Sequence, residues 1–225
     1  MLDLSAIGHE MAHLLFETYR NVFSGLLART LGRYIATVRG AVPSGVPAEV
    51  HALKCRVLET QWTRNWAAEF FCDCYAVYTF GPTFGHELVR LGLGHKWLGT
   101  PGFGDEGSHP ALLARAAVSA DFLESMGLSA RADEIRIAVA ELRSATAAPS
   151  SDQAIAYPPV LTGLVIRFAS AAFRAVGLRR FDEPSASSVD VRGFVIAAGE
   201  RRLTPDYASW EREELQRLWD ALGVR

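Results

Sequence analysis

The residues best suited to chemistry form the short run His9-Glu10-Met11-Ala12-His13 near the N-terminus. Two histidines four positions apart lie on one face of a helix, one turn apart, so both imidazoles can reach a single zinc ion. Glu10 stands between them, where it can take a proton from water at an open coordination position and pass it to a leaving group. The same short pattern also arises by chance on solvated helices.

A zinc ion needs a third protein ligand, and Glu69 is the best candidate. Glu69 and Asp73 are four positions apart, so the two carboxylates share a face of a second helix. Apolar neighbours such as Phe70 place this helix in or near the core, where carboxylates need a cation or hydrogen-bond donors. We expect Glu69 to bind the metal and Asp73 to accept a hydrogen bond from one histidine ring. The alternative is a solvent-facing acidic stripe, or pairing with Arg64 or Arg90.

This combination resembles the gluzincin metallopeptidases, in which HExxH is followed by a helical Glu-x-x-x-Asp. It is most similar to the clan of the prenyl-protein endopeptidase and the bacterial heat-shock membrane peptidase. That clan also carries His-Pro and then Arg, for which the counterpart is Ser108-His109-Pro110 with Arg115. The resemblance covers roughly Ser5 to Met126. It implies a zinc-dependent hydrolase that cleaves a peptide or protein substrate.

Three further residues are candidate donors to the oxyanion of the transition state, namely His109, Arg115 and Tyr78. Arg115 and His109 each have a structural alternative, which we favour. Arg115 would then form an ion pair, and His109 would belong to the polar start of a helix.

Other reactive residues are expected to be outside the site. His86-Glu87 begins a second copy of the motif, but Arg90 replaces the second histidine, so this pair cannot chelate in the same way. Cys72 and Cys74 flank an aspartate on its helix and face away from it, so we interpret them as small core residues.

Apolar periodicity and turn signals predict the elements that position these residues. The predicted helices run from Leu2 to about Val38, Ala48 to about Phe80, Phe84 to Leu91, Ser108 to about Met126, Ser129 to about Arg143 and Pro159 to Val176, with a last helix opened by Thr204-Pro205-Asp206. The glycine-rich run from Gly92 to Gly107 is a predicted loop, and Val189 to Ala197 fits either a strand or a helix. The fold class is therefore mainly α. We expect a zincin-like helical metal-binding core over residues 1–147 and a helical C-terminal extension over residues 148–225.

The composition is that of a globular protein, with 49% hydrophobic and 21% charged residues. The net charge is −2 and no basic block stands out, which disfavours nucleic acid as a partner. Three irregularly spaced cysteines favour a reducing compartment. No signal peptide is evident, and Arg167 and Arg174 interrupt the most apolar stretch. We therefore expect a cytoplasmic protein without an integral membrane span.

Two departures from the resembled families leave a second function open. Clan members are usually membrane-embedded, and zincins generally place a sheet ahead of the metal helix, whereas only eight residues precede His9. The scaffold is then either a reduced helical version or a chain that starts late. The rival function is a non-catalytic zinc-binding sensor or interaction module with a degenerate protease fold. The helices after Pro149 would be its partner-binding part.

Overall fold

The computed structural model describes residues 4–94, 109–144, 151–183, 191–201 and 204–222. Within these ranges the chain is helical and contains no strand, so the predicted mainly α fold is confirmed. The ambiguous segment is helical where it is described, because Val191–Arg201 forms α9. The boundary predicted near residue 147 and most of the glycine-rich loop lie outside the described residues.

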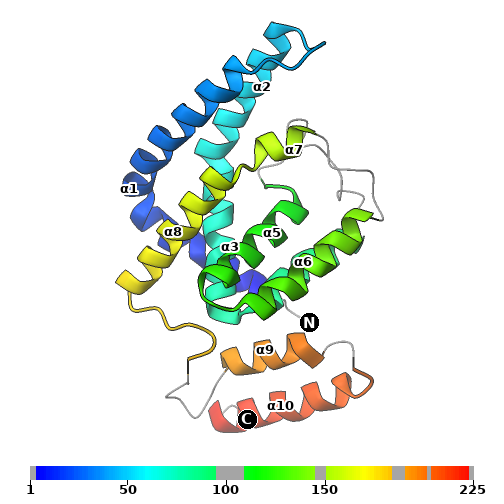
Figure 1. Cartoon of the computed structure of the whole chain (residues 1–225). Coiled ribbons are helices and arrows are strands. Elements are labelled where there is room, and N and C mark those ends of the chain that lie inside the picture. Colours follow the sequence, from blue (N-terminus) through cyan, green and yellow to red (C-terminus); the bar gives the residue numbers. More distant parts are fainter. Residues whose placement is uncertain (1–3, 95–108, 145–150, 184–190, 202–203, 223–225) are drawn as a thin grey trace.

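The first two helices form a long antiparallel hairpin (Figure 1). α1 (Leu4–Gly40) is 37 residues long, and α2 (Ala48–Gln61) returns along it after a turn. Beside the connecting turn, His51 Nε2 donates a hydrogen bond of 2.8 Å to the carbonyl of Val38, which ties the start of α2 to the end of α1. The buried side chains of α1 recur every four or seven residues, as one face of a helix requires: Ala12, Phe16, Phe23, Leu27, Leu31 and Ile35.

The segment predicted as one helix from Ala48 to Phe80 is continuous but changes its winding midway. α2 passes into a π-helical turn, η1 (Trp62–Trp66), and then into α3 (Ala67–Phe80). One extra residue in a turn rotates the following helix by about 100° relative to an uninterrupted α-helix. The rotation of α3, and with it the direction of its carboxylates, is therefore set at this turn.

Helix α3 is the central helix of the fold and packs against α1, α4, α5 and α8 (Figure 1). Its side chains are buried nearly all round, and Phe71 contacts the rings of Phe16 and Phe173 at centroid distances of 5.3 and 5.1 Å. α3 ends at Gly81, which has a positive φ of 69°. A Cβ atom there would lie 2.7 Å from the ring of Phe181, so both the conformation and the packing require glycine.

The starts of α4 and α5 differ from their predicted positions, whereas the start of α6 agrees with its predicted position. α4 (Pro82–Gly94) leads toward the undescribed stretch, and α5 (Leu112–Ser125) follows it. α5 does not begin at Ser108-His109-Pro110, because Ala111 still has extended backbone angles and is the N-cap. α6 (Ser129–Ser144) includes Ser129 as its first residue, and the hydroxyl of Ser129 donates to Glu124.

The remaining helices cover α3 and extend the fold at one end. α7 (Ser151–Ala156) and α8 (Pro159–Ala175) follow α6, and α8 contributes Leu161, Val165 and Phe173 to the same hydrophobic core as α1 and α3. α9 and α10 (Tyr207–Leu222) lie side by side below the other helices in Figure 1. In the part of the chain described, no helix combines the length and apolar character needed to cross a membrane.

Candidate metal centre

The two motifs singled out in the sequence meet where α1 crosses α3. His9 Nε2 lies 3.3 Å from Oε2 of Glu69, and His13 Nε2 lies 3.5 Å from Oε1 of the same carboxylate. The other ring nitrogen of His9, Nδ1, lies 3.0 Å from Oδ1 of Asp73. The structure thus brings together His9, His13, Glu69 and Asp73 from helices that are about 60 positions apart in the sequence.

Asp73 lies at the base of this site and is completely buried. Arg115 of α5 binds it through two nitrogens, with Nε 2.9 Å from Oδ2 and Nη2 2.6 Å from Oδ1. Burial alone would raise the pKa of Asp73, but the charge of Arg115 and the hydrogen bonds from His9 and Arg115 lower it below its usual value. Asp73 is therefore an anion that holds His9 in one orientation. Arg115 has the ion-pair role expected as its structural alternative.

Glu69 is buried just above Asp73 and has one oxygen without a hydrogen bond. Oε2 lies 3.3 Å from His9 Nε2, 3.5 Å from His109 Nε2 and 3.8 Å from Arg115 Nη2, yet none of these contacts has hydrogen-bond geometry. Burial would raise the pKa of Glu69, but contact with His9 and the charges of Arg115 and His109 outweigh burial and lower it. Oε2 of Glu69 therefore faces basic side chains from α1 and from the start of α5 without accepting a hydrogen bond from them.

His9 is fixed by aromatic packing as well as by Asp73. Its ring stacks on Phe84 of α4 at 5.9 Å and meets the ring of His13 edge-on at 5.3 Å. Burial lowers the pKa of His9, but the hydrogen bond to Asp73, the close contact with Glu69 and the charge of Asp73 raise it to about 9 in total. The metal-free site therefore holds a proton on His9, and a metal ion has to displace that proton.

Cys72 is completely buried in the core, as predicted, but it also belongs to the same cluster as the two histidines. Its Sγ atom and one nitrogen each of His9 and His13 lie within 4.8 Å of one another, so these three residues could hold a metal ion. The reason is spacing: Cys72 follows Glu69 by three positions and so shares its face of α3. Burial raises the pKa of the Cys72 thiol, and the charges of Asp73 and Glu69 raise it further. Cys74 is completely buried, as expected of a core residue.

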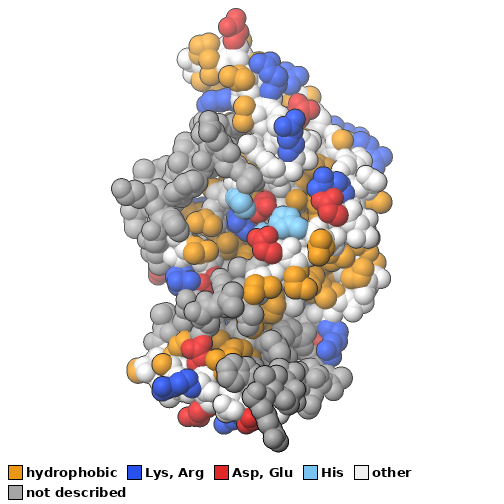
Figure 2. All heavy atoms as spheres, turned by 180° about the vertical axis from the view of Figure 1, so that it is seen from behind, with side chains coloured by type: hydrophobic (Ala, Val, Ile, Leu, Met, Phe, Trp, Pro, Cys, Tyr) orange, Lys and Arg blue, Asp and Glu red, His pale blue; other side chains and the backbone are white. Residues whose placement is uncertain are grey.

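The site opens to solvent on the side away from Asp73. The His13 side chain is 35% exposed and the His109 side chain 57% exposed, and Glu10 is exposed between the two α1 histidines. Figure 2 shows histidine side chains at the surface, with acidic and basic side chains directly beside them. Water can therefore reach this side of the cluster.

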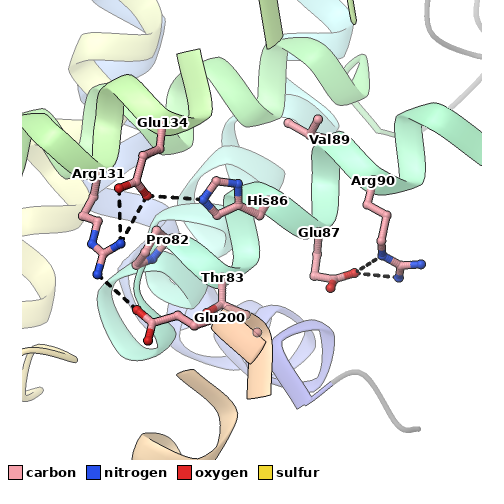
Figure 3. Close-up of a pocket in the computed structure, with 10 residues that line it drawn as sticks. Pro82, Thr83, His86, Glu87, Val89, Arg90, Arg131, Glu134 and Glu200 are labelled. Atoms are coloured by element: carbon pink, nitrogen blue, oxygen red, sulfur yellow. Dashed lines mark hydrogen bonds and ion pairs between the residues drawn. The ribbon is translucent and has the colours of Figure 1, made fainter. Parts of the chain in front are cut away.

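Two sequence candidates lie elsewhere. Tyr78 packs in the aromatic core against Phe173, with ring centroids 5.2 Å apart, and not beside the histidines. His86 lines a separate pocket of about 700 Å³ between α4, α6 and α9, where it faces Glu134 at 3.8 Å (Figure 3). Glu87 in the same pocket pairs with Arg90 at 2.6 Å. The second copy of the motif thus forms ion pairs.

The group whose donor atoms could hold a metal ion is His9, His13 and Cys72, which lie within 4.8 Å of one another. Metal–nitrogen and metal–oxygen bonds of 2.0–2.2 Å at tetrahedral angles separate neighbouring ligand atoms by about 3.4 Å. Glu69 lies beside this group, with Oε2 3.3 Å from His9 Nε2 and Oε1 3.5 Å from His13 Nε2. Each of these two contacts is close to the spacing of neighbouring ligand atoms, but they involve different oxygens of the carboxylate.

Comparisons of the chain with protein-family models, with curated proteins and with solved structures found no match.

Proposed function

We propose that this protein is a zinc-dependent hydrolase of the metallopeptidase type. The observation that carries the proposal is the buried Oε2 of Glu69, which lacks a hydrogen bond and lies 3.3 Å from His9 Nε2. Two imidazole nitrogens and a carboxylate are the donor set of many catalytic zinc sites. The resemblance of HExxH and Glu-x-x-x-Asp to the gluzincins supports the same function and implies a peptide or protein substrate.

In this proposal some residues bind the metal ion and others orient those ligands. His9, His13 and Glu69 would be the ligands. Asp73 would accept the Nδ1 hydrogen of His9, which leaves Nε2 free to bind metal, and Arg115 would keep Asp73 charged and in place. Zinc held in this way would polarise the scissile carbonyl and make water more acidic.

The exposed residues would carry the proton transfers. Glu10 would accept a proton from the attacking water and return it to the leaving amine, because it is exposed beside both histidines. His109 would donate a hydrogen bond to the oxygen that becomes negative in the transition state. Its side chain reaches the site from the start of α5, with Nε2 3.5 Å from Glu69.

The role of Cys72 decides between an open and a closed site. Catalytic zinc sites use three protein ligands and keep one position for water or substrate, whereas structural sites use four. Binding by His9, His13, Glu69 and Cys72 together would close the site and favour the non-catalytic zinc-binding module. Cys72 lies within 4.8 Å of both histidine donors, and the proposed open site leaves it out of the ligand set.

The decisive experiment compares two glutamates on α1 in protein loaded with zinc. Glu10→Gln should retain one zinc per chain and lose about 10²- to 10⁴-fold in peptide hydrolysis. Glu17→Gln is the matched control, because Glu17 is exposed on the same helix and pairs with Arg20. Hydrolysis of a peptide library followed by mass spectrometry gives the rate. Full activity in the Glu10 variant would rule out its role as general base.

Metal analysis of two further variants tests the ligand set. Glu69→Ala should lose zinc, whereas Cys72→Ala should keep it. If both variants lost zinc and the wild-type protein hydrolysed no peptide, the zinc would be structural and the hydrolase proposal would be wrong.

A further inference from the structure

The last two residues of α7, directly before Tyr157, are fixed to the core by hydrogen bonds from two side chains. Tyr34 of α1 donates its hydroxyl to the carbonyl of Ile155 at 2.7 Å. Trp62 of the π-helical turn donates Nε1 to the carbonyl of Ala156 at 2.8 Å. Tyr157 comes next in the chain, so its backbone starts from a rigidly held position.

The ring of Tyr157 is held as firmly as its backbone. It packs on Trp66 with centroids 4.9 Å apart and meets Phe70 edge-on at 6.0 Å. Both partners are buried, with 2% and 0% exposure. The aromatic contacts leave the ring one orientation, and so they determine where its hydroxyl lies.

The hydroxyl of Tyr157 accepts a hydrogen bond from the backbone N–H of Ala111 at 3.0 Å. Ala111 is the N-cap of α5, and its own side chain provides no cap. Backbone N–H groups at a helix start have no partner within the helix, so they need one from elsewhere. Tyr157, 46 positions away, supplies it for Ala111.

This contact bears directly on the candidate site because Ala111 follows His109 by two residues. The start of α5 is then held at two points, by Tyr157 at Ala111 and by Asp73 at Arg115, one turn further on. Pro110, between His109 and Ala111, is buried and has a restricted backbone. With those constraints the imidazole of His109 is placed 3.5 Å from Glu69.

We infer that Tyr157 is a positioning residue of the metal centre: its hydroxyl sets the start of α5 and thereby keeps His109 over Glu69. The inference rests on the proposed hydrolase function for its catalytic meaning, and on the contacts of Ala111 for its geometry. It makes the segment before α8 a part of the site.

The test replaces Tyr157 by Phe, which keeps the ring and removes only the hydroxyl. In the zinc-loaded protein kcat should fall about tenfold, the kinetic equivalent of one lost neutral hydrogen bond, while KM and zinc content stay within about twofold. Tyr34→Phe is the matched control, since it removes a hydroxyl bonded to the same segment but not to Ala111. It should leave kcat within about twofold of the wild type.

A double-mutant cycle separates positioning from general damage. If Tyr157 acts through His109, Tyr157→Phe should cost nothing further in a His109→Ala background. A full tenfold loss in that background would overturn the inference.

A second measurement decides the geometry without any activity. In the metal-free protein, NMR signals of the His109 ring and of the Ala111 amide should shift in Tyr157→Phe and not in Tyr34→Phe. Unchanged His109 signals would overturn the inference even if the protein is a hydrolase. Shifted signals in a protein that hydrolyses no peptide would support the positioning contact and refute the hydrolase function.

Discussion

Replacement of Arg115 by Met is the sharpest probe of how the site is built. Met preserves the apolar stem of the side chain and removes the guanidinium that binds Asp73 at 2.6 and 2.9 Å. Asp73 is completely buried, so its charge would lose its main partner. Breaking a buried ion pair on one side costs about 3–5 kcal/mol. His9 stays 3.0 Å from Asp73, which favours the lower end, about 3 kcal/mol, or a fall in melting temperature of roughly 6–12 °C.

Urea unfolding of metal-free protein measures this loss, and an exposed arginine provides the control. Arg136 also binds several carboxylates, among them Glu124 at 2.8 Å, but its side chain is 40% exposed. Arg136→Met should therefore leave the unfolding midpoint close to the wild-type value, because exposed ion pairs contribute little. Adding Asp73→Asn to the Arg115 variant should recover part of the loss by removing the unpaired charge. Equal midpoints for the two arginine variants, or a further loss on adding Asp73→Asn, would refute a buried, charge-dependent pair.

Two more outcomes can be checked with the same protein. The pKa of His9 is raised from 6.5 to about 9. Its protonation therefore stabilises the metal-free fold fully below about pH 6.5, and this stabilisation is lost as the pH rises through 9. Zinc has to displace the same proton, so its affinity should increase as the pH rises over that range. Unfolding midpoints and chelator competition at pH 6.5, 7.5 and 9 follow both effects, and a flat midpoint would contradict the first. The same glycine-to-alanine change should have opposite signs at Gly25 and Gly85. A Cβ at Gly25 meets nothing within 4 Å and should stabilise its helix by about 1 kcal/mol, whereas one at Gly85 lies 2.4 Å from the buried Ile135 and should cost about 1–3 kcal/mol in thermal unfolding.

The helices were predictable from the sequence because their patterns are local. Buried positions of α1 repeat at helical spacing, and Gly81-Pro82 marks a helix end through backbone geometry alone. The π-helical turn at Trp62–Trp66 was not predictable, since an extra residue in one turn leaves no compositional trace. The turn does not change the predicted relation of Glu69 and Asp73, because both residues follow it in α3 and keep their spacing of four positions.

The site was predictable only where spacing within one helix carries the information. The pairs His9 with His13 and Glu69 with Asp73 each share a helix face, and chemistry suggested that the faces meet. The place of Cys72 in the cluster was not predicted, because its side-chain direction was compared with that of the adjacent Asp73. Cys72 follows Glu69 by three positions, so the two share a helix face, and Glu69 is the residue with which its direction should have been compared. The contact of Tyr157 with Ala111 spans 46 positions and depends on tertiary packing, so no local pattern signals it.

The burial of the site explains why a helical scaffold can hold a metal without a sheet beside it. A buried ion pair such as Asp73 with Arg115 rarely adds net stability over well-packed apolar residues, so its retention in the core requires another reason. The ion pair fixes the direction of the Asp73 carboxylate, and this carboxylate fixes the ring of His9. The other side of that ring faces Oε2 of Glu69, which has no hydrogen bond. Each step is held by a helix crossing α3, and exposure grows from Asp73 at the base to His13 and His109 at the surface. Burial is therefore greatest at Asp73, which orients His9, and exposure is greatest at His13 and His109.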